Sequence, residues 1–312
     1  MKGLQRIMPI RWLLPLLLAA FCSVVTAGPL DKGRISADAK WFLHLDMEQF
    51  GPSQTCRILL QDPKGGERLR NLLAHYQGLL GADPLKSISH LTLYGEEITG
   101  SRGVALVGGA INSRAVAARL ATYPSYSNRK NERSLIHRWK DPASGTELNA
   151  CLYQSGLLVV TSDDASMDSA LGTLRGARPS LASRKTATLT LPPPAQGSFL
   201  VAASAGYAGS APNPLKAMLL RNTTCAAMQV AESKGILDAN IAMDAISTDA
   251  AYQIQQVVNG LIVSAAFTDE SSGLAKLAEM SEVSRDKNQV RLRVHCPAPE
   301  AATILASALL AK

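Results

Sequence analysis

The chain is poor in aromatic residues and in charge. Aromatic residues make up 5% and charged residues 18% of the 312 residues, against 46% hydrophobic residues. A folded core must therefore consist mainly of Leu, Val, Ile and Ala, and the high hydrophobic content excludes a disordered chain. The length is sufficient for one large domain or two ordinary ones.

The short motifs that mark common enzyme classes are also missing. The chain contains no G-x-G-x-x-G, no P-loop, no G-x-S-x-G and no H-E-x-x-H, the patterns that position phosphate groups, a serine nucleophile or a catalytic zinc. Two S-x-x-K matches begin at Ser127 and Ser284, but no S-D-N or K-T-G accompanies them. The sequence predicts no cofactor and is more typical of a binding protein than of an enzyme.

The first 27 residues have the composition of a secretion signal. Lys2, Arg6 and Arg11 form a basic start, residues 13–25 are mainly apolar, and a Val-Thr-Ala sequence ends at Ala27. We expect cleavage near Ala27 and export to the periplasm or the cell exterior. An uncleaved membrane anchor is the alternative, although the apolar run is short for a membrane span. No later stretch is long and apolar enough to cross a bilayer.

Removal of this segment leaves a mild positive charge. Three of the 32 Lys and Arg residues lie in it, so 29 basic residues face 25 acidic ones and the net charge is +4. Nucleic-acid binding usually needs clustered basic residues and aromatic side chains that stack on bases. We therefore expect no nucleic-acid partner; the partners that fit are another envelope protein or an acidic glycan.

Four cysteines follow the signal: Cys56, Cys151, Cys225 and Cys296. An even number in an exported protein permits two disulfides. Pairing within each half of the chain, Cys56 with Cys151 and Cys225 with Cys296, is the preferred connectivity. The alternative is that the cysteines are small buried hydrophobic residues. No C-x-x-C occurs, so neither a zinc knuckle nor a thioredoxin-type site is predicted.

The hydrophobic pattern predicts an α+β fold in two similar units. Residues 192–197, Pro-Pro-Pro-Ala-Gln-Gly, cannot form a helix interior or a central strand, and they divide residues 28–191 from residues 198–312. Each half has roughly the order strand, helix, two strands, helix, strand, helix. This order predicts a mainly antiparallel sheet with helices packed on one face, and it suggests an internal duplication.

Individual elements follow from spacing and from turn residues. In the first half we expect strands at 41–48, 87–95, 103–111, 133–140, 147–153 and 157–162, and helices at 53–60, at 69–80, after Asn112 and after Asp163. In the second half we expect strands at 198–204, 224–232, 236–246 and 289–296, and helices at 214–221, 254–265, 274–280 and from Pro299. A strand at 261–267 is an alternative.

The strand predicted from Trp41 to Glu48 carries the best candidates for chemistry. His44, Asp46 and Glu48 share one face because side chains alternate along a strand, and His90 joins them if the strand at 87–95 lies alongside. Two imidazoles and two carboxylates can bind a divalent metal or act as acid and base, which defines a metal-assisted hydrolase as the alternative function. The other interpretation is a half-exposed sheet with a polar, solvated face.

Two further polar patterns have non-functional interpretations. Arg291, Arg293 and His295 alternate with apolar residues, as do Asp238 and Asp244 on a neighbouring predicted strand, so these faces should neutralise each other. A basic stretch could contact an acidic glycan or a membrane surface, or it forms a protected hairpin edge; its residues are Arg129, Lys130, Arg133, Arg138 and Lys140.

The run from Ala37 to Met47 resembles the mature start of a group of bacterial exported proteins with no known activity. The Leu93–Gly95 sequence and residues 159–179, which include Leu174-Arg175-Gly176, extend this resemblance over most of the first half. The resemblance implies an exported α+β protein and carries no catalytic residue with it. We expect a non-catalytic binding or interaction protein of the bacterial cell envelope.

Overall fold

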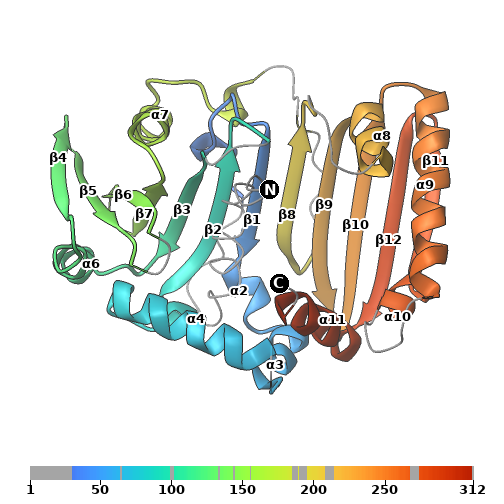
Figure 1. The fold of residues 1–312 in the computed structure, drawn as a ribbon, viewed down its shortest axis with the longest axis horizontal. Helices are drawn as coiled ribbons and strands as arrows, with labels where there is room; N and C mark the ends of the chain where they lie inside the picture. The colour runs from blue at the N-terminus through green and yellow to red at the C-terminus, as the bar shows by residue number, and fades with distance from the viewer. Residues whose placement is uncertain are drawn as a thin grey trace, which may run out of the picture. The chain divides into compact units, whose positions relative to one another are not determined.

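The computed structural model of the chain describes the residues 30–63, 65–98, 102–132, 134–142, 145–154, 156–184, 189, 195–207, 214–267 and 274–310 (Figure 1). The expected signal at 1–27, its cleavage site and residues 192–194 of the expected linker lie outside these residues, as does Arg133. The described chain divides into two compact units. Unit 1 contains the described residues up to Gly51 and those of Leu69–Thr186, and unit 2 contains those of Pro52–Arg68 and Ala187–Lys312.

The division predicted from the sequence placed the segment Pro52–Arg68 in the first unit, and the structure places it in the second. It contains α3 (Gln54–Gln61), which packs against α11 (Ala298–Leu310) of unit 2. The Glu232 carboxylate accepts hydrogen bonds from the Gln54 and Thr55 backbone N–H groups, at 2.6 and 3.0 Å. These bonds satisfy free donors at the start of α3, so the helix belongs to the second unit.

Unit 1 is an antiparallel sheet with helices at its faces and ends. Its strands are β1 (Trp41–Asp46), β2 (Ile88–Gly95), β3 (Val104–Gly109), β4 (Ser127–Asn131), β5 (Ser134–Lys140), β6 (Glu147–Leu152) and β7 (Leu157–Thr161). They lie in the order β1-β2-β3-β7-β6-β5-β4. The helices are α2 (Met47–Phe50), the part of α4 (Gly65–Leu80) from Leu69 onward, α5 (Pro84–Ser87), α6 (Ser113–Leu120) and α7 (Asp164–Leu174), with short 3₁₀ turns at Lys32–Arg34 and Leu181–Ser183.

Helix α7 shows how the sequence directs packing in unit 1. Met167, Ala170 and Leu171 are fully buried, as their spacing predicts. Asp163 caps the start by accepting a hydrogen bond from the Ser166 N–H at 2.8 Å. Gly176 ends the helix with a φ of +75°, a conformation that glycine adopts at no steric cost. The helix is therefore held at both ends and along its inner face.

Unit 2 contains β8 (Ser198–Ala205), β9 (Thr223–Ser233), β10 (Ile236–Ala245), β11 (Ser281–Asp286) and β12 (Gln289–Pro297), in the order β11-β12-β10-β9-β8. Its helices are α3, α8 (Pro214–Asn222), α9 (Thr248–Ala266), α10 (Leu274–Glu279) and α11. The first turns of α9 pack on β10 and β12 through Ala251, Ile254 and Val258. Figure 1 shows α9 running alongside β12 and β11.

The two sheets share one strand plan. In unit 1, β1, β2 and β3 pair in succession, and the last strand, β7, returns to pair with β3. In unit 2, β8, β9 and β10 pair in succession, and β12 returns to pair with β10. Unit 1 has the additional strands β4 and β5. The α+β class is confirmed, and the shared plan agrees with the internal duplication that the element order suggests.

Candidate functional site

The face of β1 that carries His44 is buried, not solvated. Strand β1 pairs with β2 in a register that sets His44 opposite Thr92 and Asp46 opposite His90, so these side chains do come together. However, His44 is only 3% exposed and Asp46 7% exposed. The prediction of a half-exposed sheet with a polar outer face is therefore wrong for β1: the polar face is buried, and the half-buried residues Trp41 and Leu43 lie on the apolar face.

Glu48 does not join this group. The strand ends at Asp46, whose carboxylate accepts hydrogen bonds from the Glu48 and Gln49 backbone N–H groups at 3.0 and 3.1 Å. Asp46 thereby acts as the N-cap of α2, and the chain leaves the strand before Glu48. Burial raises the pKa of Asp46, although the two N–H groups oppose the rise. The presence of a buried carboxylate at Asp46 is therefore explained by its role as a helix cap.

The two imidazoles lie close together without forming a metal site. Their ring centroids are 5.9 Å apart. His44 Nδ1 lies 2.8 Å from the Thr92 hydroxyl, and His90 Nδ1 lies 3.0 Å from the Ser89 hydroxyl. Burial, and secondarily the Arg34 charge, lowers the pKa of His90. Within the described parts of the chain, no three His, Cys, Asp or Glu side chains are arranged so that they could hold a metal ion.

The four cysteines are buried and form no disulfide, so the predicted disulfides are wrong for this structure. Cys225 lies opposite Asp244 and Cys296 opposite Leu237, near the two ends of β10. Seven residues of extended strand correspond to about 23 Å, whereas a disulfide needs Cα atoms within about 7 Å. Cys56 belongs to unit 2 and Cys151 to unit 1. The alternative interpretation, buried hydrophobic thiols, describes these residues.

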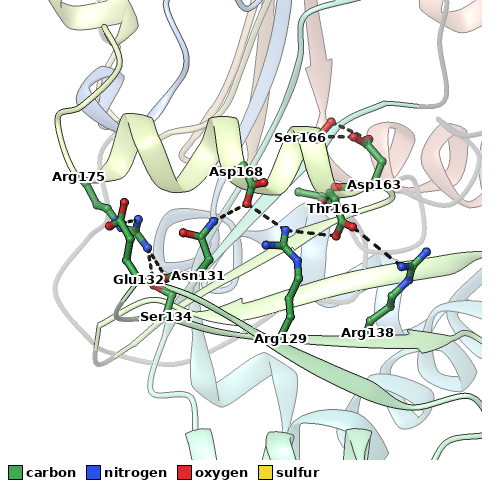
Figure 2. A network of polar contacts seen from close by, with 11 residues as sticks. Arg129, Asn131, Glu132, Ser134, Arg138, Thr161, Asp163, Ser166, Asp168 and Arg175 are labelled. Atoms are coloured by element: carbon green, nitrogen blue, oxygen red, sulfur yellow. Dashed lines mark hydrogen bonds and ion pairs between the residues drawn. The ribbon is translucent and has the colours of Figure 1, made fainter.

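The basic stretch of unit 1 is neutralised by the chain itself. Figure 2 shows Arg129 and Arg138 pointing from β4 and β5 toward α7. Arg129 forms ion pairs with Asp164 and Asp168 at 3.3 and 3.0 Å, and Arg138 forms one with Glu147 at 2.5 Å. Lys130 and Lys140 are exposed. This arrangement favours the interpretation as a charged hairpin edge, which is held to α7. In the described part of the stretch, both arginines are paired, so they do not form an unpaired cluster for an acidic glycan.

Beyond the end of α7, a further arginine closes the same network (Figure 2). The Arg175 guanidinium donates to the Glu132 carboxylate at 2.5 Å, to the Ser134 hydroxyl at 2.9 Å and to the Asn131 carbonyl at 3.2 Å. Acidic residues near the first turn of α7 and a basic residue past its last turn both complement the helix dipole. The network therefore orients α7 on the sheet.

The polar faces of unit 2 also neutralise each other, as the alternation predicts. Strands β10 and β12 pair Asp238 with His295 and Asn240 with Arg293. The Arg293 side chain lies 3.3 Å from the Asp238 carboxylate, and His295 Nδ1 lies 3.7 Å from it. These contacts pair opposite charges across the two strands, although the Arg293 and His295 side chains remain exposed.

A polar cleft lies at the end of β2, the start of β3 and the start of α7 in unit 1, and we call it the unit 1 cleft. Its volume is about 160 Å³. Tyr94, Val104 and Ser169 are buried residues of its lining, which also contains exposed charged side chains of both signs. Residues near position 95 and position 165 build it together, and no sequence motif marks either segment.

Tyr94, one of the residues that line the cleft, has a buried hydroxyl without a partner among the described protein groups. Tyr94 is 1% exposed, and its hydroxyl forms no hydrogen bond with the described protein groups. Burial, and secondarily the Glu96 charge, raises the pKa of Tyr94 well above its usual range. The hydroxyl therefore remains protonated and able to donate a hydrogen bond at neutral pH.

The charged residues of the cleft are held in different ways. Glu96 Oε1 accepts hydrogen bonds from the Ser36 and Ser169 hydroxyls, at 3.1 and 3.2 Å. The Arg102 guanidinium lies 3.9 Å from the Glu97 carboxylate, and the Arg178 guanidinium lies 3.9 Å from a carboxylate outside the cleft lining. Distances of 3.9 Å exceed hydrogen-bond length, so both arginines keep donor capacity.

The last turns of α9 in unit 2 are apolar and exposed. Leu261, Val263 and Phe267 are 48%, 57% and 86% exposed. Most apolar side chains on a soluble helix are expected to face the core, so this end of α9 differs from its buried first turns. Across the described residues, no helix is both long and apolar enough to span a membrane.

Comparisons with known proteins relate the chain to solved structures only. No protein-family model and no curated protein sequence matches it. A crystal structure of TP0453, crystal form III, has a similar fold, with a TM-score of 0.51 and 7% identity over 89% of this chain and 98% of that chain. Crystal form IV gives a TM-score of 0.49 and 8% identity over 90% of this chain and 97% of that chain. At this identity the likeness shows the fold alone.

Proposed function

We propose that the protein is a non-catalytic binding protein of the bacterial cell envelope and that the unit 1 cleft is its ligand site. The Tyr94 hydroxyl carries this proposal, because it is buried and has no partner among the described protein groups. Buried polar groups almost always form a hydrogen bond, and one left unsatisfied costs about 1–3 kcal/mol. A ligand atom that accepts from Tyr94 would remove this cost.

The chemistry of the cleft supports binding rather than catalysis. Its described lining contains no His, Cys or Lys side chain, the groups that most often serve as base or nucleophile. The Ser166 hydroxyl donates to the Asp163 carboxylate at 2.7 Å, and the Ser169 hydroxyl donates to Glu96. These serines are therefore oriented by carboxylates and lack the imidazole that usually activates a serine nucleophile.

The basic start and apolar run of residues 1–27 support an envelope location, periplasmic or extracellular, for this binding protein. Edman sequencing of protein recovered from the periplasm or the medium tests this part. Export requires the bulk of the protein in one of these fractions with a new N-terminus near Gly28, and a cytoplasmic protein that keeps Met1 would contradict it.

A ligand screen tests the binding site itself. The purified protein is exposed to a library of small polar molecules while ligand resonances are followed by saturation-transfer NMR. We expect at least one binder whose affinity falls about tenfold in Tyr94→Phe, because the variant removes one buried hydrogen bond. Tyr153→Phe is the matched control: it removes a hydroxyl that donates to the Leu174 carbonyl at 3.1 Å, outside the cleft lining. Binders that respond equally to both substitutions, or to neither, would overturn the assignment.

A further inference from the structure

We infer that the unit 1 cleft takes a small zwitterion, a free amino acid or a molecule of similar size with one carboxylate and one ammonium group. This inference rests on the proposed function, because it names the ligand class of the same cleft. Three features of the cleft lead to it: arginine donors in the lining, carboxylates in the same lining, and a small volume.

The donors suit a carboxylate. Arg102 and Arg178 both line the cleft, and each lies 3.9 Å from its nearest paired carboxylate oxygen. Guanidinium groups bind carboxylates through two parallel N–H donors, which an ion pair at 3.9 Å leaves available. The Tyr94 hydroxyl adds a buried donor. Ala165 and Ser166, in the first turn of α7, place the positive end of the helix dipole at the same lining.

The carboxylates suit an ammonium group. Glu96 is anchored by two serine hydroxyls, and both hydrogen bonds go to Oε1. Anchoring reduces the entropy lost when a ligand binds. Glu97 and Asp163 also line the cleft. A simple anion would meet these carboxylates, and a simple cation would meet the two arginines. A ligand that carries both charges satisfies both kinds of charged group in the lining.

The volume limits the ligand to a small molecule. Pockets for drug-sized ligands usually measure about 300–1,000 Å³, whereas this cleft measures about 160 Å³. The space therefore fits a single amino acid better than a peptide or a sugar chain.

Gly172 positions one of the arginines. The backbone N–H groups of Ala177 and Arg178 both donate to the Gly172 carbonyl, at 2.9 and 3.1 Å, which turns the chain back along α7. A Cβ atom at Gly172 would lie 3.1 Å from both Cγ and Cδ of Arg178. The missing side chain at this position thus lets the Arg178 stem lie against the helix and places its guanidinium at the cleft. Gly172 is a positioning residue for the site.

The test uses isothermal titration calorimetry of the purified protein with the twenty amino acids. Each amino acid that binds is then compared with its N-acetyl derivative, which keeps only the carboxylate, and with its amide, which keeps only the ammonium group. We expect at least one amino acid to bind. Both of its derivatives should bind at least about tenfold more weakly, because each loses one set of charged hydrogen bonds.

Three variants locate the binding. Arg178→Gln and Glu96→Gln should each weaken binding of the amino acid about tenfold. Arg178→Gln should also narrow the difference in affinity between the amino acid and its amide, because the amide already lacks the carboxylate that Arg178 would bind. Glu96→Gln should narrow that difference less. Gly172→Ala should reproduce the Arg178→Gln loss in part. Lys86→Gln is the charge-matched control, because Lys86 is exposed outside the cleft lining and should leave affinity unchanged.

The two proposals fail in different ways. If the library screen yields a Tyr94-dependent binder that is neutral or singly charged, and no amino acid binds, the zwitterion inference is wrong while the cleft remains a ligand site. If N-acetyl derivatives bind as well as the amino acids, the inference is also wrong. If neither the library nor the amino acids contain a binder sensitive to Tyr94→Phe, both proposals are wrong.

Discussion

Replacement of Tyr94 by phenylalanine should not destabilise the ligand-free protein. The substitution keeps the buried ring and removes a hydroxyl that has no partner among the described protein groups. Relief of an unsatisfied buried hydroxyl is worth about 1–3 kcal/mol, offset in part by the small void that remains. We therefore expect the free energy of unfolding to be unchanged or raised by about 1 kcal/mol. This sign is the opposite of that for most buried substitutions.

Tyr153→Phe provides the matched comparison in the same unit. Its hydroxyl donates to the Leu174 carbonyl at the end of α7, at 3.1 Å. Removal of a formed hydrogen bond costs about 0.5–1.5 kcal/mol, so the expected order of stability is Tyr94→Phe at or above the parent protein and Tyr153→Phe below it.

Urea unfolding followed by tryptophan fluorescence measures this order. Trp12 lies in the expected signal, and the other two tryptophans, Trp41 and Trp139, both belong to unit 1. Fluorescence of the mature protein therefore reports on the unit that contains the cleft. With equal m values, the midpoints give the difference in stability directly. A Tyr94→Phe variant less stable than the parent by more than about 1 kcal/mol would show that the hydroxyl has a structural partner and would refute the reasoning.

Three further predictions concern other parts of the structure. Gly108→Ala should cost about 1–3 kcal/mol in urea unfolding, because its Cβ would lie 2.0 Å from Cε1 of His90 and the ring must move; an unchanged midpoint would contradict this packing. Because the folded-state pKa of His90 lies below its ordinary 6.5, the unfolded chain binds more protons, so stability should fall as pH is lowered through 6.5. His90→Gln should reduce that slope and His75→Gln, at an exposed position, should serve as its control; equal slopes in all three proteins would reject this origin. Ile254→Ala should cost about 2–5 kcal/mol and Leu261→Ala about 0.5 kcal/mol or less in thermal unfolding followed by circular dichroism, because the first side chain is fully buried and the second is 48% exposed; similar losses would mean that the end of α9 is packed in solution.

Local signals in the sequence predicted many element boundaries correctly. Asn112 and Ser53 cap helices through the hydrogen bonds expected of them, to the Ala115 and Cys56 N–H groups at 3.1 and 3.0 Å. The turn between β9 and β10 uses Lys234 and Gly235, both with positive φ, as a two-residue hairpin requires. These features depend on a few neighbouring residues, so a single sequence is enough to recognise them.

Two edge strands were not predicted as they occur. Strand β4 has the sequence Ser-Asn-Arg-Lys-Asn and β11 has Ser-Glu-Val-Ser-Arg-Asp. Both lack a clear apolar face, because each lies at the edge of its sheet and is largely exposed. Polar edge strands protect a sheet from pairing with other chains, and the same polarity removes the alternation by which a strand is recognised.

The sequence by itself determined the α+β class, most helix caps and turns, and the pairing of charged faces between β10 and β12. Only the tertiary structure decided that the His44 face is buried, that the cysteines lie too far apart to pair within unit 2, and that Pro52–Arg68 packs in the second unit. Alternation along a strand shows which side chains share a face, but which face is covered depends on helices that arrive from elsewhere in the chain. The unit 1 cleft has the same origin: Tyr94 and Ser169 meet there because α7 folds back over the ends of β2 and β3, and no local pattern records that contact.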